Sequence, residues 1–405
     1  MKLSLFFNRL VKPTVLLCLL AIVFLPALGC ATPAVQGGSG LAGSEGKLYF
    51  ASTDGKVIAL DVSARSANLS FPSEGEWVIS LRSQTASGGS ICGPACAPAA
   101  KPAAVYATPV VAGDLIYVAT YAGNNGKVMA INRLAPGYDE EGIPSWTEGE
   151  WFYPRKEQKF IGAVVGNPVV DEDTLYIGSS DGKLYALNAV NGNKRWDFDT
   201  GGKIWAAPSV SNGIVYVSNF AKKICAISGD TGELLWQVEF PVAIASSSIV
   251  SGDNIIFGTF DNHLYSVSSI DGKERWKFKG DGWFWASPVA KDNIVYAGCL
   301  DHRVYAIDAS TGEELWRFEC DSSFVVPPVL VENSLAICSE SGSLYILDAA
   351  KGTMVRTVSI GAKVMAPIYS DGDMVYIHAR DRNIYCVDLH SGQIAWKFSS
   401  VIVNK

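Results

Sequence analysis

Short apolar runs separated by turn residues make up most of the chain. Between Phe284 and Asp308, β-branched and aromatic runs are interrupted by Asp-Asn and by Asp-His-Arg, and Ser-Thr-Gly then precedes Glu-Glu-Leu-Trp-Arg-Phe. This pattern predicts four short strands joined by tight turns. No sustained apolar spacing of three and four residues is present in the unit, which argues against helical repeats of similar length.

The same unit returns at intervals of forty residues. The series that keep this interval are Gly192, Gly232, Gly272, Gly312, Gly352 and Gly392; Trp196, Trp236, Trp276, Trp316, Arg356 and Trp396; and Tyr185, Cys225, Tyr265, Tyr305, Tyr345 and Tyr385. A period of this size is typical of solenoids, propellers and arrays. Four strands in about 40 to 45 residues predict a propeller blade.

The glycine and tryptophan of each unit have separate expected roles. The glycine can take a positive φ where the third turn reverses the chain. The tryptophan, four residues later, is expected on the outermost strand, where its indole covers the seam with the next blade. The residues expected in this docking role are Trp196, Trp236, Trp276, Trp316 and Trp396.

Counting the units predicts an all-β, eight-bladed β-propeller of four-stranded antiparallel blades over residues 46–405. Units are expected to begin near Val105, Ile161, Ile204, Ile244, Phe284, Phe324 and Val364. The first unit starts at Gly46 without an inner strand, and the chain runs on from Trp396 to Val403. We therefore expect this last segment to supply the missing strand, so that pairing of N- and C-terminal strands closes the ring.

Two early units carry additional sequence. Glu-Gly-Glu-Trp occurs twice, ending at Trp77 and at Trp151, which suggests that these tryptophans fill the docking position in blades one and two; Trp146 competes for it in blade two. A loop rich in Gly, Ala, Pro and Ser includes Cys92 and Cys96, which could form a small disulfide. Such insertions are equally consistent with binding loops and with tolerated surface loops.

The motif Ala-x-Asp-x-x-Thr-Gly-x-x-x-Trp, which ends at Trp316, resembles the tryptophan-docking motif of PQQ-repeat propellers. The resemblance covers nearly all of the chain after the leader. Asn188, Ser228 and Ser268 depart from the Asp of the motif, and Arg356 departs from the Trp.

The N-terminus predicts export. Basic residues precede the apolar run from Thr14 to Leu28, and Gly29-Cys30 follows. The run is short for a membrane span, which needs about 20 apolar residues. We interpret residues 1–29 as a lipoprotein-type signal peptide, Cys30 as the lipidated residue and the only membrane contact, and residues 30–45 as a flexible tether. Cleavage after Ala31 by ordinary signal peptidase is the alternative.

Composition limits the function classes. The formal charge of −7 and the absence of a basic cluster in the sequence argue against a nucleic-acid-binding surface. The four histidines do not accompany a nucleophile or zinc-protease motif. Aspartates in the turns between second and third strands could together hold a cation, although Asp is also a good turn former: Asp54, Asp181, Asp261, Asp301 and Asp381.

The resemblance separates two functions. Quinoprotein dehydrogenases of this fold bind PQQ and Ca²⁺ below a disulfide between adjacent cysteines, and this chain has no adjacent Cys pair. Leader, blade count and length instead resemble lipid-anchored assembly proteins of the BamB type. We therefore expect a non-catalytic, monomeric, membrane-anchored scaffold that binds an envelope protein, without cofactor or metal. A PQQ-dependent oxidoreductase and a surface sensor of ligands or polymers are the alternatives.

Aromatic residues before the first strands of several blades suggest where a partner binds. The first strand of a propeller blade lines the channel, so side chains just before it surround the channel mouth. We expect the partner site there, formed by Trp205, Trp283, Phe284, Trp285 and Phe324. Packing between blades is the alternative role, and it applies most directly to Trp205 and Trp285, which share one register.

Overall fold

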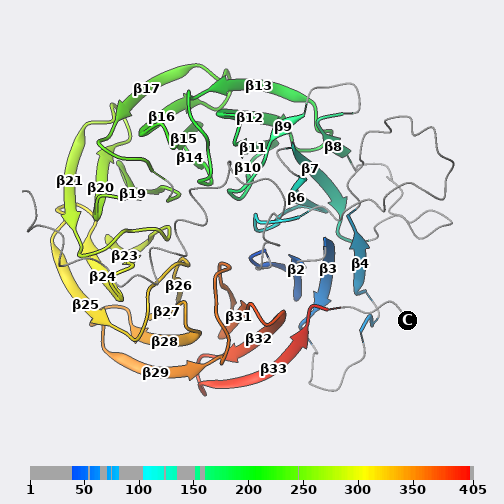
Figure 1. Cartoon of the computed structure of the whole chain (residues 1–405), viewed down its shortest axis with the longest axis vertical. Helices are drawn as coiled ribbons and strands as arrows, with labels where there is room; N and C mark the ends of the chain where they lie inside the picture. The colour runs from blue at the N-terminus through cyan, green and yellow to red at the C-terminus, as the bar shows by residue number, and fades with distance from the viewer. Residues whose placement is uncertain are drawn as a thin grey trace, which may run out of the picture. The chain divides into compact units, whose positions relative to one another are not determined.

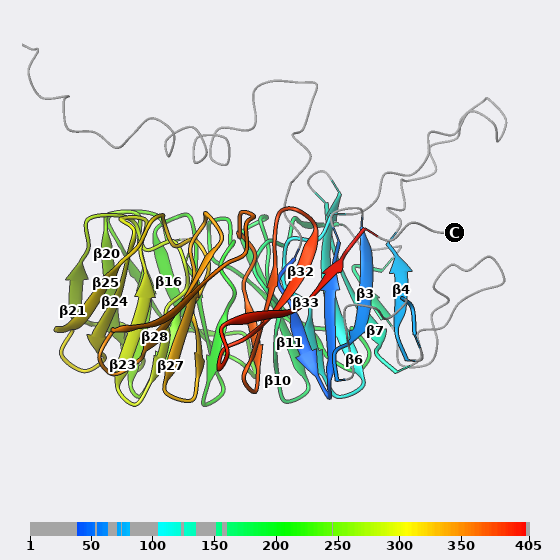
Figure 2. The same cartoon turned by 90° about the horizontal axis from the view of Figure 1, so that it is seen from below.

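The computed structural model describes residues 39–52, 55–63, 71–73, 75–81, 104–122, 125–134, 151–155, 160–244 and 246–401. These residues form eight antiparallel sheets, and no helix occurs among them. Figure 1 shows the sheets arranged around a central axis, and Figure 2 shows that their strands run between two faces of a ring. The predicted eight-bladed β-propeller is confirmed.

Each blade is built from consecutive strands. Blade one contains β1 (Ala42–Ser44), β2 (Lys47–Ala51), β3 (Lys56–Asp61) and β4 (Trp77–Ser80). Blade two contains β5 (Val110–Ala112), β6 (Leu115–Ala122), β7 (Asn125–Asn132) and β8 (Trp151–Tyr153), and β9 (Ile161–Gly162) also pairs with β7. Blade three contains β10 (Val169–Asp171), β11 (Thr174–Gly178), β12 (Lys183–Asn188) and β13 (Lys194–Asp199). Blade four contains β14 (Ser209–Ser211), β15 (Ile214–Ser218), β16 (Lys223–Ser228) and β17 (Leu234–Glu239).

The second half of the ring repeats this order closely. Blade five contains β18 (Ile249–Ser251), β19 (Asn254–Gly258), β20 (His263–Ser268) and β21 (Glu274–Lys279). Blade six contains β22 (Val289–Lys291), β23 (Ile294–Gly298), β24 (Arg303–Asp308) and β25 (Glu314–Glu319). Blade seven contains β26 (Val329–Val331), β27 (Ser334–Cys338), β28 (Ser343–Asp348) and β29 (Met354–Ser359). Blade eight contains β30 (Tyr369–Asp371), β31 (Met374–His378), β32 (Asn383–Asp388) and β33 (Gln393–Ser399).

The two middle strands of each blade hold the core, because both of their faces are covered by neighbouring blades. Most of the residues of β23 and β24 are buried, whereas β25 alternates between exposed and half-buried positions. In blade six the pairing of β24 with β25 shifts by one residue after Ala306–Trp316. The same bulge recurs in blades three to eight, so the repeat fixes register as well as strand order.

The docking tryptophans join successive blades. Trp196 Nε1 donates to the carbonyl of Gly229 in the next blade at 2.8 Å, and the indole lies over Gly232, where a Cβ atom would come within 2.7 Å of it. Equivalent bonds to the next blade are made by Trp77, Trp151, Trp236, Trp276 and Trp316. Trp396 is buried between blade eight and blade one. In blade seven the aliphatic stem of Arg356 lies over Gly392 instead.

Ring closure differs from the sequence-based expectation. The inner strand of blade one is β1, which pairs with β2, and the described chain after β33 ends at Val401 without joining blade one. The expected pairing of N- and C-terminal strands is therefore wrong. Residues 39–45, which we assigned to the tether, instead enter blade one, because Ala-Gly-Ser can serve as a short inner strand despite its weak apolar pattern. The ring closes by side-chain packing between Leu41, Phe50, Trp396 and Phe398.

Candidate functional site

The antiparallel order of strands gives the ring two different faces. One carries the connections between blades and the turns between second and third strands, and we call it the connection face. The other carries the turns between first and second strands and between third and fourth strands, and we call it the hairpin face. Residues that precede a first strand therefore lie on the connection face.

Five aromatic side chains meet on the connection face across blades four, five and six, and we call them the aromatic surface: Trp205, Phe220, Phe260, Trp283 and Trp285. Phe220 contacts Trp205 with ring centroids 4.7 Å apart and Phe260 at 6.2 Å. Phe260 in turn contacts Trp283 at 5.1 Å and Trp285 at 5.6 Å. All five are half-buried, so each presents part of its ring to solvent.

The fold brings these residues together through backbone contacts near the ends of strands. The N–H of Phe220, in the turn after β15, donates to the carbonyl of Lys203 at 2.9 Å, which places that turn beside Trp205. Trp205 Nε1 also donates to Ser180 Oγ in blade three at 3.1 Å. Trp285 stacks on Phe260 of the preceding blade. The tryptophan rings are thus oriented by contacts on two blades, which reduces the rotamer freedom that a partner would have to remove.

Two of the five expected partner-binding residues belong to the core. Phe284 and Phe324 are 1% and 0% exposed. They occupy the place of Ile204, Ile244 and Val364, which are also buried. Burial alternates along this segment, so Phe284 packs in the core whereas Trp283 and Trp285 lie against Phe260 on the connection face. The expectation that Phe284 and Phe324 contact a partner is therefore wrong, whereas Trp205, Trp283 and Trp285 lie together.

Sequence reasoning missed the aromatic residues in the turns. Phe220 and Phe260 keep the forty-residue interval, but only two units carry an aromatic residue at this position, so the series is not evident from sequence. Blade two has a similar pair, in which Tyr106 and Tyr121 stack at 4.8 Å and their hydroxyls lie 2.8 Å apart. The spacing within one unit marks Trp205 with Phe220 and Tyr106 with Tyr121, but it does not mark Phe260, because no aromatic residue stands at the matching position before the first strand of its own unit.

The aspartates in the turns hold their own blades together. The hydroxyl of Tyr265 donates to Asp261 at 3.0 Å, and equivalent bonds join Tyr185 to Asp181, Tyr305 to Asp301 and Tyr385 to Asp381. Burial raises the pKa of Asp261, but hydrogen bonds from Thr259 and Tyr265 outweigh it and lower the pKa overall. No group of three possible metal ligands occurs in the part of the chain that the structure describes. Asp54 lies outside the described residues.

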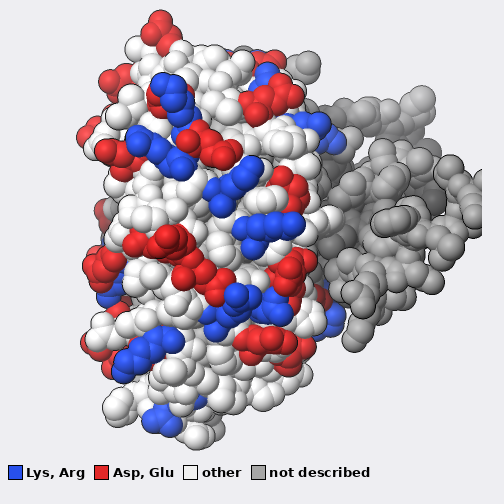
Figure 3. All heavy atoms as spheres, turned by 90° about the vertical axis from the view of Figure 1, so that its left-hand side faces the viewer, with Lys and Arg blue, Asp and Glu red and all other residues white. Residues whose placement is uncertain are grey.

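The hairpin face is acidic. Turns between first and second strands carry exposed carboxylates in every blade except blade four: Glu45, Asp114, Asp171, Glu172, Asp173, Asp253, Asp292, Glu332, Asp371 and Asp373. On the side of the ring at the left of Figure 1, Lys and Arg are interspersed with Asp and Glu, so this part of the outer wall is mixed in sign (Figure 3). Exposed carboxylates therefore recur around most of the hairpin face.

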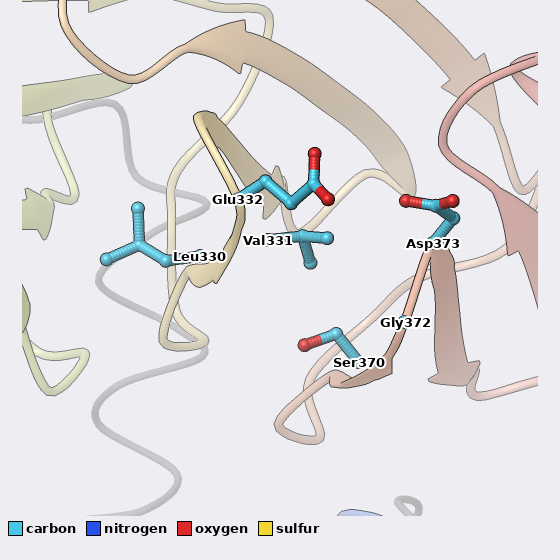
Figure 4. Close-up of a pocket in the computed structure, with 6 residues that line it drawn as sticks. All are labelled: Leu330, Val331, Glu332, Ser370, Gly372 and Asp373. Atoms are coloured by element: carbon cyan, nitrogen blue, oxygen red, sulfur yellow. The ribbon is translucent and has the colours of Figure 1, made fainter.

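A recess of about 350 Å³ opens on the hairpin face between blades seven and eight. It is lined by Leu330, Val331, Glu332, Ser370, Gly372 and Asp373, and the carboxylates of Glu332 and Asp373 face each other across it (Figure 4). The recess does not include any residue of the aromatic surface.

Four buried cysteines are poorly suited to covalent chemistry. Cys225, Cys299, Cys338 and Cys386 are buried free thiols, and burial raises the pKa of Cys225 to about 11 and that of Cys386 to about 12. The neutral thiol is a weak nucleophile. Cys30, Cys92 and Cys96 lie outside the described residues, as does Trp146. Within the described part, no helix has the length and apolar character of a membrane span.

Comparison with solved structures shows relatives of this fold. BamB from Moraxella catarrhalis matches with a TM-score of 0.58 and 17% identity, over 72% of this chain and 87% of that chain. The computationally designed Ika8 protein matches with a TM-score of 0.65 and 15% identity, over 86% of this chain and 95% of that chain. No sequence among the curated proteins is similar enough to count as a relative.

A family model for PQQ-repeat propellers, described as outer membrane protein assembly factor BamB, matches residues 137–280, 261–355 and 287–398. The matched segments run from blade two to blade eight, so they include all six glycines of the forty-residue series. With repeat, blade count and strand order in agreement, this chain belongs to the family of PQQ-repeat β-propellers described as outer membrane protein assembly factor BamB.

Proposed function

We propose that this protein is a lipid-anchored, non-catalytic scaffold of the cell envelope that binds a protein partner through the aromatic surface. The observation that carries the proposal is the cluster of five half-buried aromatic residues on blades four to six. Rigid aromatic side chains with partial burial are typical of residues that dominate binding energy. Family membership supports the scaffold role and an action in envelope or outer membrane protein assembly.

Partner capture tests the site. Trp283→Ala should weaken capture from native membranes by about 1–3 kcal/mol while leaving the unfolding midpoint nearly unchanged. Trp205→Ala should weaken capture to a similar extent, and it also removes the hydrogen bond to Ser180. Leu235→Ala is the matched control, because Leu235 is an exposed apolar side chain on the outer strand β17. Phe324→Ala should instead lower stability by about 3–5 kcal/mol, as a core truncation. Equal capture by the Trp283 and Leu235 variants would exclude the aromatic surface as the docking site.

The anchor and the non-catalytic role need separate measurements. Cys30→Ser should release the protein into the soluble fraction, and intact-mass analysis of the wild type should show an acylated N-terminal Cys30. An unmodified terminus after Ala31 would refute lipid anchoring. Addition of PQQ and Ca²⁺ should produce no dye-linked oxidation of alcohols or sugars. Gain of that activity would favour the quinoprotein alternative. We place the anchor at the periplasmic face of an outer membrane or the outer face of the cytoplasmic membrane.

A further inference from the structure

The chain enters the ring on the connection face, at the seam between blades eight and one. Ser39 is buried, its N–H donates to Ala51, and its carbonyl lies 3.0 Å from His378 Nδ1. Ser218 occupies the equivalent position in blade four, and its Oγ donates to the carbonyl of Ser246, where blade five begins. Residues 30–38 separate Cys30 from this point, and nine residues reach at most about 30 Å. A lipid on Cys30 would therefore hold the connection face near the membrane.

Beside this entry point, blade eight presents a group of exposed basic and apolar side chains, which we call the basic patch: Lys363, Met365, Arg380, Arg382, Lys397 and Val401. Backbone and side-chain contacts hold it together. The N–H of Arg380 donates to Lys363, the guanidinium of Arg380 lies 3.5 Å from Met365 Sδ, and the N–H of Ser400 donates to Arg382. Met365 and Val401 are 42% and 44% exposed.

The patch carries excess positive charge. Among the described residues, Lys363 pairs with Glu340 at 2.9 Å and Lys397 lies 3.4 Å from Asp381. The carboxylate of Asp381 also accepts hydrogen bonds from Tyr385 and Asn383, so Lys397 is one of several groups that it binds. The hairpin face, on the opposite side of the ring, carries exposed carboxylates in seven of the eight blades. An anionic surface would therefore attract blade eight and repel the hairpin face.

We propose that the basic patch lies against the anionic headgroups of the membrane that holds the anchor, with Met365 and Val401 at the interface. This inference rests on the lipid anchor of the proposed function and adds a second contact to Cys30, which sequence alone suggested as the only one. Lipid anchors are commonly supplemented by basic residues in this way. The aromatic surface lies on the same connection face but across the ring from blade eight (Figure 1), so binding through the basic patch would tilt the ring and leave a gap for a protein partner at blades four to six.

The contribution of the basic patch to membrane binding can be measured with full-length Cys30→Ser protein, which lacks the lipid anchor. This protein should bind vesicles of three parts phosphatidylcholine to one part phosphatidylglycerol more tightly than pure phosphatidylcholine vesicles, and raised salt should weaken this binding. Adding Lys363→Gln and Arg382→Asn should weaken it about tenfold. The matched control is the Cys30→Ser protein that carries Lys203→Gln and Lys222→Asn in place of the two blade-eight substitutions. These residues occupy the same positions in blade four, the change in charge is equal, and Lys222 and Arg382 share a positive φ.

The control pair should change vesicle binding less than about twofold. Equal losses in both variants, or equal binding to both kinds of vesicle, would overturn the proposal. Loss of partner capture by the blade-eight variant, with vesicle binding intact, would also overturn it and indicate an acidic protein at the patch. The lipid-anchor proposal is tested separately, because intact-mass analysis of the wild type shows whether Cys30 is acylated, independently of the vesicle measurements.

Discussion

At the residue scale, the ring depends on one repeated contact between an indole and a glycine. Gly312 has φ +78°, and a Cβ atom there would come within 2.7 Å of Trp276 in the preceding blade. Backbone conformation and close packing therefore both require glycine. The glycine and tryptophan series keep one interval because each pair acts across a seam rather than within a blade.

Gly312→Ala separates these two requirements when it is compared with Gly213→Ala. Gly213 has φ +72°, but no atom lies within 4 Å of the Cβ position. The control should lose about 1–2 kcal/mol from backbone strain alone, and Gly312→Ala should lose about 1–3 kcal/mol more from overpacking. Guanidinium unfolding measures both. Similar losses would show that the indole moves aside without cost.

At the element scale, His378 in β31 of blade eight contacts the segment that leads into β1. It is buried, lies 5.6 Å from the ring of Phe50, and its Nδ1 faces the carbonyl of Ser39. Burial lowers the pKa of His378, and the Ser39 bond and the charge of Asp381 oppose this shift only partly. The neutral imidazole is therefore the form that the folded seam accommodates.

This predicts acid sensitivity at the seam. Because the pKa of His378 is lower in the folded protein than its unfolded value near 6.5, its contribution to stability is complete above about pH 6.5 and is lost as pH falls below it. His378→Ser, which imitates Ser218 of blade four, should flatten stability between pH 7 and pH 5, whatever its absolute stability at pH 8. Parallel pH profiles of urea midpoints for variant and wild type would contradict the prediction.

The strand pattern was predictable from sequence because each blade repeats the same turns and apolar runs. Ring closure was not, because Ala42–Ser44 is too short and too weakly apolar to be recognised as a strand before it pairs with β2. The docking role of Trp77 and Trp151 was predictable from the repeated Glu-Gly-Glu-Trp, and their indoles indeed bond to the next blade.

The candidate site was only partly predictable. Trp205, Trp283 and Trp285 were identified from their position before first strands, but the direction of each side chain depends on register, which decides that Phe284 and Phe324 are buried. Phe220 and Phe260 lie in turns far along the chain from Trp285. Phe220 pairs with Trp205 of its own unit, but only the fold brings Phe260 to Trp283 and Trp285 of the next blade.

At the scale of the whole molecule, the ring is closed by packing rather than by a shared strand. Removal of residues 402–405 should therefore leave the unfolding midpoint within about 0.5 kcal/mol of wild type. Deletion of residues 1–45 removes β1 and exposes Leu48 and Phe50, and it should cost several kcal/mol. Deletion of residues 1–38 is the control that keeps β1. A large loss on removing residues 402–405 would restore the closure that the sequence first suggested.

Because every blade consists of consecutive strands, the chain could begin at any blade without dividing a sheet. Ser39 and Ser400 are both bound to blade eight, one through His378 and the other through Arg382. A short linker could therefore join Ser39 to Ser400, and new ends could be opened in a connection between blades. A chain rearranged in this way would keep all eight sheets intact, and it would allow the proposed membrane tether to be moved from blade to blade as an engineering variable.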